Sequence, residues 1–261
     1  MYRISQLFIY PIKSLGGISL QESRVEARGL AYDRRWMLCD ENKQFITQRE
    51  HKELALFKLQ QIDSGFGINY KSERFQIPFG VNGTSTQVKI WDDVCDAIEF
   101  LEGSIWFTSV LGYTCKLYYM PNDSKRKVDE KFAKGKHINS FSDAFPILIA
   151  GQQSLNQLNL KMKQAIDINR FRPNIVFDGG EPFCEDNFRI FSIHKTILQC
   201  VKPCARCQVI GINQTSSEIN TEPLKVLATF RTQENKIMFG QNVIVIQAGE
   251  LIKVGDLLIA D

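Results

Sequence analysis

Three cysteines that lie close together late in the chain are the residues best suited to carry chemistry. Cys200, Cys204 and Cys207 follow the spacing C-x3-C-x2-C, and Lys202 and Arg206 lie among them. Neighbouring cations stabilise the thiolate, which is the form of cysteine that binds metals. Clustered thiols beside cations therefore predict a metal or redox site in this segment.

The spacing fits several kinds of metal site incompletely. Radical enzymes that use S-adenosylmethionine hold a four-iron cluster with this motif and continue into an α/β barrel, whereas the residues after Cys207 read as strands. Adding Cys184 gives four thiols, enough for a tetrahedral structural zinc. A plant-type ferredoxin needs C-x4-C-x2-C, which is absent here. The remaining alternative, buried cysteines that act as small hydrophobes, suits Cys39, Cys95 and Cys115.

The composition is that of an ordinary globular protein with no strong charge bias. The 261 residues allow one large domain or two modest ones, and 44% of them are hydrophobic. The formal net charge is only +3, which does not indicate a nucleic-acid binder.

The cysteine count and the lengths of the apolar runs indicate in which cellular compartment the protein is expected. The chain has seven cysteines, an odd number, and residues 1–7 lack the pattern of an export signal, so a disulfide framework is not expected. The longest apolar runs, such as 144–150, are too short to span a bilayer. We therefore expect a cytoplasmic protein whose partners include neither membrane nor nucleic acid.

The elements that must position these cysteines read mainly as strands. Strands are expected at 4–12, 36–39, 88–91, 174–177, 243–247 and 251–254. A helix is expected over 104–112, capped by Ser104 and ended by Gly112, with Trp106, Phe107, Val110 and Leu111 on one face. A second helix is expected from Ser154, with Leu155, Leu158 and Met162 at helical spacing. This pattern predicts a mainly β fold with a few helices, of the α+β class.

Residues 121–137 read as a connector between two halves. They carry six Lys or Arg residues and few apolar side chains. We interpret the segment as a solvated, mobile loop, and the alternative is a docking patch for an acidic electron donor.

Several separated segments resemble the MOSC domain and the β-barrel that precedes it in one branch of that family. The MOSC-like segments are 169–174, 201–207, 222–224, 239–242 and 254–256, and the barrel-like segments are 10–14 and 32–36. Their order along the chain is more specific than any one of them. The resemblance implies an N-terminal β-barrel domain over 1–120 and a MOSC β-barrel domain over 121–261.

That branch includes the mitochondrial amidoxime reducing component and its bacterial relatives. The resemblance implies a molybdenum cofactor, Mo-molybdopterin, in which Cys207 ligates the metal while Cys204 and Cys200 are structural neighbours. The implied reaction is the two-electron reduction of N-hydroxylated compounds, such as hydroxylated nucleobases or amidoximes. Some bacterial relatives carry a ferredoxin domain, and because none is seen here a separate electron-donor protein is expected.

The resemblance also implies a set of residues that contact the cofactor. These residues are Lys13, Ser14, Arg34, Ser142, Asp143, Arg172, Asn174, Ala205, Arg206 and Asn242. An anionic pterin needs cations and directed donors, and Arg and Lys supply both to a phosphate. Taken singly, Lys13 and Arg34 would read as surface cations, Asn174 as a turn residue and Asp143 as a helix cap.

Two other functions stay open at this stage. MOSC domains are also attached to molybdenum-cofactor sulfurases, so the chain could be a cofactor carrier or a sulfur-transfer module. It could also be a structural zinc protein without catalysis.

Overall fold

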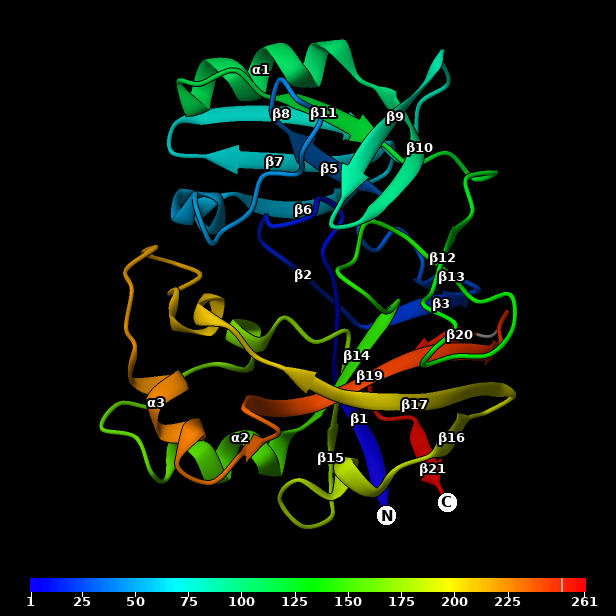
Figure 1. The fold of residues 1–261 in the computed structure, drawn as a ribbon, viewed down its shortest axis with the longest axis vertical. Helices are drawn as coiled ribbons and strands as arrows, with labels where there is room; N and C mark the ends of the chain where they lie inside the picture. The colour runs from blue at the N-terminus through cyan, green and yellow to red at the C-terminus, as the bar shows by residue number, and fades with distance from the viewer. Residues whose placement is uncertain (250) are drawn as a thin grey trace.

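The computed structural model describes residues 1–249 and 251–261. The fold is mostly β, with 42% of residues in strands and 17% in helices. Figure 1 shows two stacked parts: a barrel at the bottom, where both termini lie, and a second group of sheets at the top. This arrangement confirms the predicted fold class, a β-barrel-like domain together with a MOSC barrel.

The lower part is a closed barrel of seven strands within the described residues. In order around the barrel these are β14 (Ile147–Gly151), β15 (Ile175–Asp178), β1 (Tyr2–Ile9), β21 (Leu257–Ala260), β16 (Ile190–Ile193), β17 (Thr196–Ala205) and β19 (Lys236–Gln247). The antiparallel pairing of β14 with β19 closes it. Two further strands, β2 (Ile18–Leu20) and β18 (Thr232–Gln233), extend the same sheet.

Gly240 makes the closure of the barrel possible. It has φ +74 and lies beside the seam between β19 and β14, where a Cβ atom would be 2.7 Å from the carbonyl oxygen of Ile149. Only a residue without a side chain allows the two backbones to approach this closely in the left-handed conformation.

The upper part contains two antiparallel sheets and the longest helix. One sheet has the order β5 (Trp36–Cys39), β11 (Lys116–Tyr119), β10 (Asp93–Glu99), β9 (Ser85–Ile90), and the other is β6 (Lys58–Ile62), β7 (Gly65–Tyr70), β8 (Glu73–Pro78). Helix α1 (Leu101–Leu111) covers this part at the top of Figure 1. One apolar cluster runs from barrel residues such as Leu198 to Phe107 of α1, so the two parts share a continuous core.

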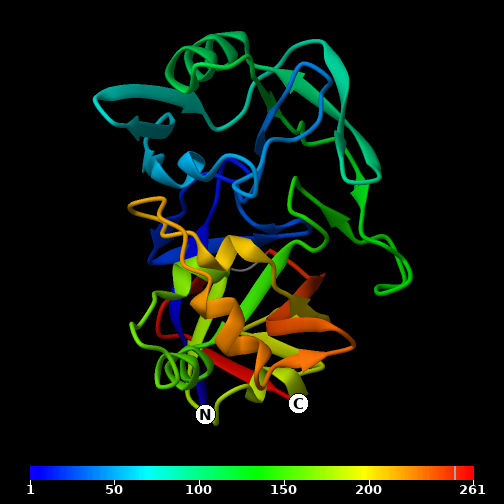
Figure 2. The same cartoon turned by 60° about the vertical axis from the view of Figure 1, so that its left-hand side comes forward.

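Shorter elements complete the chain. They are β3 (Glu22–Glu26), β4 (Gly29–Leu30), β20 (Leu251–Lys253), β12 (Arg126–Lys127), β13 (Ile138–Asn139), α2 (Gln152–Asn159) and α3 (Glu222–Ala228). Four 3-10 turns lie at η1 (Lys52–Leu56), η2 (Ile168–Phe171), η3 (Cys184–Asn187) and η4 (Gln208–Gly211). Figure 2 shows α2 and α3 on the outside of the barrel.

The chain order does not follow the two parts of the fold strictly. Strand β1, from the extreme N-terminus, is hydrogen-bonded between β15 and β21 of the barrel. The chain then passes to the upper part and returns to the barrel at β14. The predicted division near residue 120 stays a prediction.

The predicted helices exist, with different starts. Helix α1 begins at Leu101, so Ser104 is not its cap; Ser104 is buried and its Oγ accepts a hydrogen bond from the Leu117 backbone N–H at 2.9 Å. Gly112 ends the helix in the left-handed conformation, as predicted. The predicted apolar face is also confirmed, since Phe107 is fully buried in the core. Helix α2 begins at Gln152, before Ser154.

The connector is more structured than the sequence predicted. Strands β12 and β13 pair within and beside it, and Val128 and Ala133 are buried. Arg126, expected to be solvated, is only 6% exposed. The solvated-loop interpretation is therefore wrong for these residues, because a lysine-rich stretch can still bury the few residues that face the barrel. In the described part of the chain, no helix is both long enough and apolar enough to cross a membrane.

Candidate functional site

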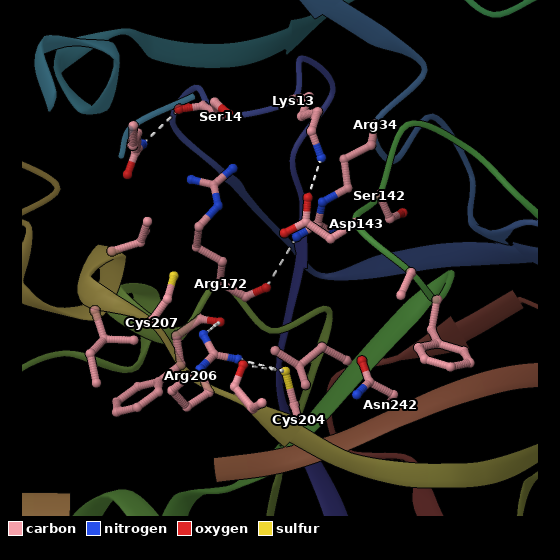
Figure 3. A pocket seen from close by; sticks show the side chains of 18 of the residues that line it. Lys13, Ser14, Arg34, Ser142, Asp143, Arg172, Cys204, Arg206, Cys207 and Asn242 are labelled. Atoms are coloured by element: carbon pink, nitrogen blue, oxygen red, sulfur yellow. Dashed lines mark hydrogen bonds and ion pairs between the residues drawn. The ribbon is translucent and has the colours of Figure 1, made fainter. Parts of the chain in front are cut away.

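One cavity brings together the residues that the sequence singled out. It has a volume of about 210 Å³ and is bordered by segments from both parts of the fold. The predicted residues on its wall are Lys13, Ser14, Arg34, Ser142, Asp143, Arg172, Asn174, Ala205, Arg206, Cys207 and Asn242. Figure 3 shows the cations and the two thiols distributed around this space. Their role in binding stays a prediction.

Three of these residues have strained backbones. Ser14, Arg34 and Arg172 all have positive φ, at 70, 49 and 55. A residue with a side chain adopts this conformation uncommonly and at a cost of about 1–3 kcal/mol, and such positions gather at binding sites. The fold therefore holds these three side chains at an energetic cost, which fits a site shaped for a ligand.

Arg34 is fixed by neighbours on three sides. Its guanidinium donates to the Asp33 carboxylate at 2.6 Å, to Oδ1 of Asn174 at 3.2 Å and to the Arg172 carbonyl at 3.3 Å. It also lies over the ring of Tyr10, 4.4 Å from the centroid. Because Asp33 is buried, the pair raises the pKa of Arg34 above its usual value in spite of the desolvation that opposes it.

The amides of Asn174 and Asn242 hold backbone in place around the cavity. Oδ1 of Asn174 accepts the Leu148 N–H at 3.1 Å, and its Nδ2 donates to the Phe8 carbonyl at 3.2 Å. Nδ2 of Asn242 lies 3.3 Å from the carbonyl oxygen of Pro203, next to Cys204. Both residues therefore position the strands that carry the polar wall.

The two cavity cysteines differ in their surroundings. A guanidinium nitrogen of Arg206 donates to Sγ of Cys204 at 3.0 Å, and the other terminal nitrogen donates to the Phe171 carbonyl at 2.6 Å. Cys207 is half-buried and immediately precedes the 3-10 turn η4. Figure 3 shows the two sulfur atoms at different places on the wall, Cys207 toward Arg172 and Cys204 toward Asn242.

The other cysteines do not form a metal site. Cys184 and Cys200 pack against the apolar core, and burial raises the pKa of the Cys200 thiol to about 12. Within residues 1–249 and 251–261, no group of three or more His, Cys, Asp or Glu residues is placed to hold a metal ion. The four-thiol zinc interpretation is therefore wrong, because the fold separates Cys184 and Cys200 from the cavity cysteines.

Arg126 organises the segment that carries Ser142 and Asp143. Its guanidinium donates to the backbone carbonyls of Ser140 and Asp143, both at 2.9 Å, and to that of Ser142. It also pairs with Asp93 at 2.7 Å. No sequence pattern marks this role, because Arg126 lies between the exposed lysines Lys125 and Lys127.

A second missed group is Thr47, Gln48 and Arg49, which line the cavity from the upper part. The side-chain amides of Gln48 and Gln214 donate to each other at 3.2 and 3.0 Å, which ties this segment to the loop after Cys207. Arg49 lies beside Cys207 and 3.6 Å from Asp143. Desolvation opposes its charge, but the Cys207 thiol and the Asp143 carboxylate raise the pKa of its guanidinium. No spacing or composition signal marks these three residues.

Comparison with protein families agrees with the two-part architecture. Residues 1–114 match the family described as the MOSC N-terminal beta barrel domain, and residues 136–258 match the MOSC domain. This chain is a MOSC-domain protein.

Two kinds of protein are among the relatives of this MOSC protein. Mitochondrial amidoxime-reducing component 1 of Xenopus laevis is 29% identical over 97% of this chain and 80% of its own length, and that of Mus musculus is 28% identical over 87% and 71%. Molybdenum cofactor sulfurase of Oryza sativa subsp. japonica is 26% identical over 91% of this chain. The chain spans only 32% of that sulfurase.

The cavity of the MOSC protein contains donors that no protein group satisfies. In the described part of the chain, both terminal nitrogens of Arg172, Nε of Arg206 and Oγ of Ser142 are buried without a hydrogen-bond partner. Burial and the nearby Arg34 lower the pKa of Arg172 to about 10. Buried donors are almost always paired in native proteins, so these groups indicate a ligand that supplies acceptors.

Proposed function

We propose that this chain binds a molybdenum cofactor in the cavity and reduces N-hydroxylated compounds. The single observation that carries the proposal is the unsatisfied guanidinium of Arg172 in the same cavity as the half-buried thiol of Cys207. An anion with several acceptors would satisfy the Arg172 guanidinium, and a soft metal would bind the Cys207 thiol.

The residues present fit an anionic molybdenum cofactor, and we propose that its form is Mo-molybdopterin. Five cations line the cavity, namely Lys13, Arg34, Arg49, Arg172 and Arg206, while Asp143 is the one carboxylate among its lining residues in the described part of the chain. The phosphate and the pterin heteroatoms of the cofactor would supply the acceptors that Arg172, Arg206 and Ser142 lack. A cationic ligand would leave the terminal nitrogens of Arg172 without an acceptor, so the excess of positive charge on the wall favours an anionic cofactor.

The residues have separate tasks in the proposed reaction. Cys207 would be the protein ligand of the metal, and the cations would hold the anionic part of the cofactor. When bound, the cofactor supplies the two electrons that cleave the N–O bond. The overall change is R–N–OH plus two electrons and two protons to R–N–H plus water. Arg49, beside Cys207, would stabilise negative charge at this end of the cavity.

Electrons would come from a separate redox protein with an acidic surface. Burial is the main cause that lowers the pKa of Lys202, and the nearby ammonium groups of Lys236 and Lys131 lower it further. The Lys202 ammonium lies 3.7 Å from the ring centroid of Phe132 and 5.1 Å from that of Phe145, which lines the cavity. This cationic surface is complementary to an acidic donor.

We also propose a cytoplasmic location. All seven cysteines are free. Free thiols in this number are in keeping with a reducing compartment.

The test is a metal analysis combined with turnover. The protein is purified from cells that make molybdopterin, and molybdenum is measured in wild type, Cys207→Ala and Cys200→Ala. Wild type and Cys200→Ala should contain about one molybdenum per chain and reduce benzamidoxime with a chemical electron donor, whereas Cys207→Ala should do neither. Cys200 is a suitable control because it is a thiol seven residues earlier in the chain, in β17, that packs against the core instead of lining the cavity. Wild-type protein without molybdenum would disprove the proposal.

A second candidate is a cofactor carrier or sulfur-transfer module. The sulfurase similarity over 91% of this chain favours it, as does the second thiol, Cys204, held by Arg206 in the cavity. This function predicts that loaded protein passes its cofactor to a molybdenum-free client enzyme without any turnover of benzamidoxime. The same preparations separate the two candidates.

A further inference from the structure

Trp91 occupies a position that suits glycine better. Strands β9 and β10 are joined by the two-residue turn Trp91–Asp92, since Ile90 pairs with Asp93. Trp91 has φ 55. Two-residue hairpin turns with positive φ normally contain Gly, Asn or Asp, and a bulky residue there is an outlier. The strain suggests that the indole itself is needed at this place.

The indole is anchored at the rim of the cavity. Its Nε1 donates to Oδ1 of Asp143 at 3.3 Å, and the guanidinium of Arg49 lies 4.7 Å from its ring centroid. Phe45 supports it from an edge-to-face contact with centroids 4.9 Å apart. Asp143 and Arg49 both line the cavity, and Arg49 lies beside Cys207. Contacts therefore run without interruption from the Trp91 ring to the thiol.

This anchored indole is still open to solvent. Trp91 is 48% exposed, whereas Trp36 is fully buried and Trp106 is packed against the core. A large aromatic surface that is fixed in orientation and left wet can receive a flat ligand at little entropic cost.

We propose that Trp91 is a substrate-binding residue that stacks on the flat aromatic or heteroaromatic part of an N-hydroxylated substrate. Arg49, which lies over the ring and beside Cys207, aligns that part with the reacting end of the cavity. The inference rests on the proposed function and narrows it, because the rim would favour aromatic over aliphatic N-hydroxy compounds. Stacking on an aromatic side chain is tolerant of ring type, so nucleobases and benzene rings would both be accepted.

The kinetic test compares two substrates that share the N–OH group. Benzamidoxime is flat and aromatic, and acetamidoxime is aliphatic. Trp91→Ala should lower kcat/KM for benzamidoxime by about 5- to 150-fold, the range that loss of one stacking contact gives, and leave kcat/KM for acetamidoxime unchanged. Trp91→Phe should retain most of the benzamidoxime activity. Equal losses on both substrates, or no loss on either, would overturn the proposal.

Controls separate stacking from damage to the fold. Val94→Ala removes another exposed apolar side chain of the same hairpin, one that does not line the cavity. It should leave kcat/KM unchanged for both substrates. Trp91→Gly relieves the left-handed strain, so this variant should unfold at no lower temperature than Trp91→Ala. Its kcat/KM for benzamidoxime should fall to the same extent. A large loss of melting temperature in both variants would instead assign Trp91 a structural role.

A binding measurement tests the stacking even if the proposed function fails. Benzamidine should quench tryptophan fluorescence of the wild type more strongly than acetamidine does. This difference should vanish in Trp91→Phe, because Trp36 is buried and Trp106 is packed against the core. Quenching without turnover would support Trp91 as an aromatic binding site and rule out the proposed reductase function. Absence of a difference between the two amidines would reject the aromatic site.

Discussion

The ammonium group of Lys13 is bound to the Asp143 carboxylate, although the two residues are 130 positions apart in the chain. Lys13 is buried and also donates to the Phe141 carbonyl at 2.9 Å, whereas the Asp143 side chain is 56% exposed. Burial lowers the pKa of Lys13 to about 8, against the opposing effect of Asp143. Desolvation raises the pKa of Asp143, but Lys13, Arg49 and the Trp91 hydrogen bond together lower it, so that it lies well below its usual range. The pair joins the first turn of the chain to the segment held by Arg126.

Asp143→Asn should destabilise the protein in a pH-dependent way. A carboxyl whose pKa is lowered in the folded state contributes stability above its ordinary pKa, and this contribution is lost as the pH falls through the folded-state pKa. The variant should therefore be less stable than wild type by about 1 kcal/mol at pH 7, a modest value because water screens the half-exposed carboxylate. Urea unfolding at pH 7, 4 and 3 would measure this. A difference that stays constant or grows toward pH 3 would contradict it.

Arg126→Met should unfold far more easily than a neighbouring variant. Three backbone carbonyls and Asp93 lose a charged donor, and a hydrogen bond to a charged group contributes roughly 1.5–3 kcal/mol, so a loss of about 3 kcal/mol or more is expected. Lys125→Met is the matched control, because Lys125 is exposed. Urea unfolding of both variants provides the comparison, and equal midpoints would show that the carbonyls find other donors.

The sequence predicted the strands and the chemical character of the site, but not how distant segments meet. Apolar runs and turn residues are local signals, so the strand at Trp36–Cys39 was predicted with its observed bounds. Long-range pairing has no local signal. Nothing in the residues of β1 shows that it lies between β15 and β21, and so the seven-stranded barrel appears only in the structure.

The site was predicted where segments resemble a family, and missed where roles depend on contacts. Arg34 and Arg172 were found because they lie in family-like segments. Arg126 was missed because its neighbours are solvated lysines, and only the fold shows which cation of the stretch is buried. Arg49 was missed because a single cation in a turn is usually a surface residue. The Gln48–Gln214 amide pair holds this turn close to the loop after Cys207.

Gly240→Ala should destabilise the barrel more than the same change at Gly112. The two glycines have nearly equal φ, +74 and +76, so both variants bear the left-handed cost of about 1–2 kcal/mol. At Gly112 a Cβ atom meets nothing within 4 Å, whereas at Gly240 it would lie 2.7 Å from the Ile149 carbonyl oxygen. Gly240→Ala should lose roughly 1–3 kcal/mol more, because backbone must move to accept the methyl group. Thermal unfolding of both variants measures the difference, and equal melting temperatures would mean that the seam between β14 and β19 yields easily.

Arg172→Gln should stabilise the cofactor-free protein while weakening cofactor binding. The terminal nitrogens of Arg172 have no acceptor in the described chain. Burial together with Arg34 lowers the pKa of Arg172 to about 10, although the Tyr10 ring, 4.2 Å from the guanidinium, opposes this shift, so the fold holds the charge unfavourably. Removing this buried charge should raise the unfolding free energy of cofactor-free protein by about 1 kcal/mol, because binding residues are often held at a cost to stability. Arg34→Gln should act in the opposite direction, because it leaves Asp33 and Asn174 without their donor. Urea unfolding of protein made without the cofactor, and molybdenum content of protein made with it, would test both changes. If Arg172→Gln destabilised the cofactor-free protein, or retained full molybdenum, Arg172 would be a structural residue and not the anion-binding group of the cavity.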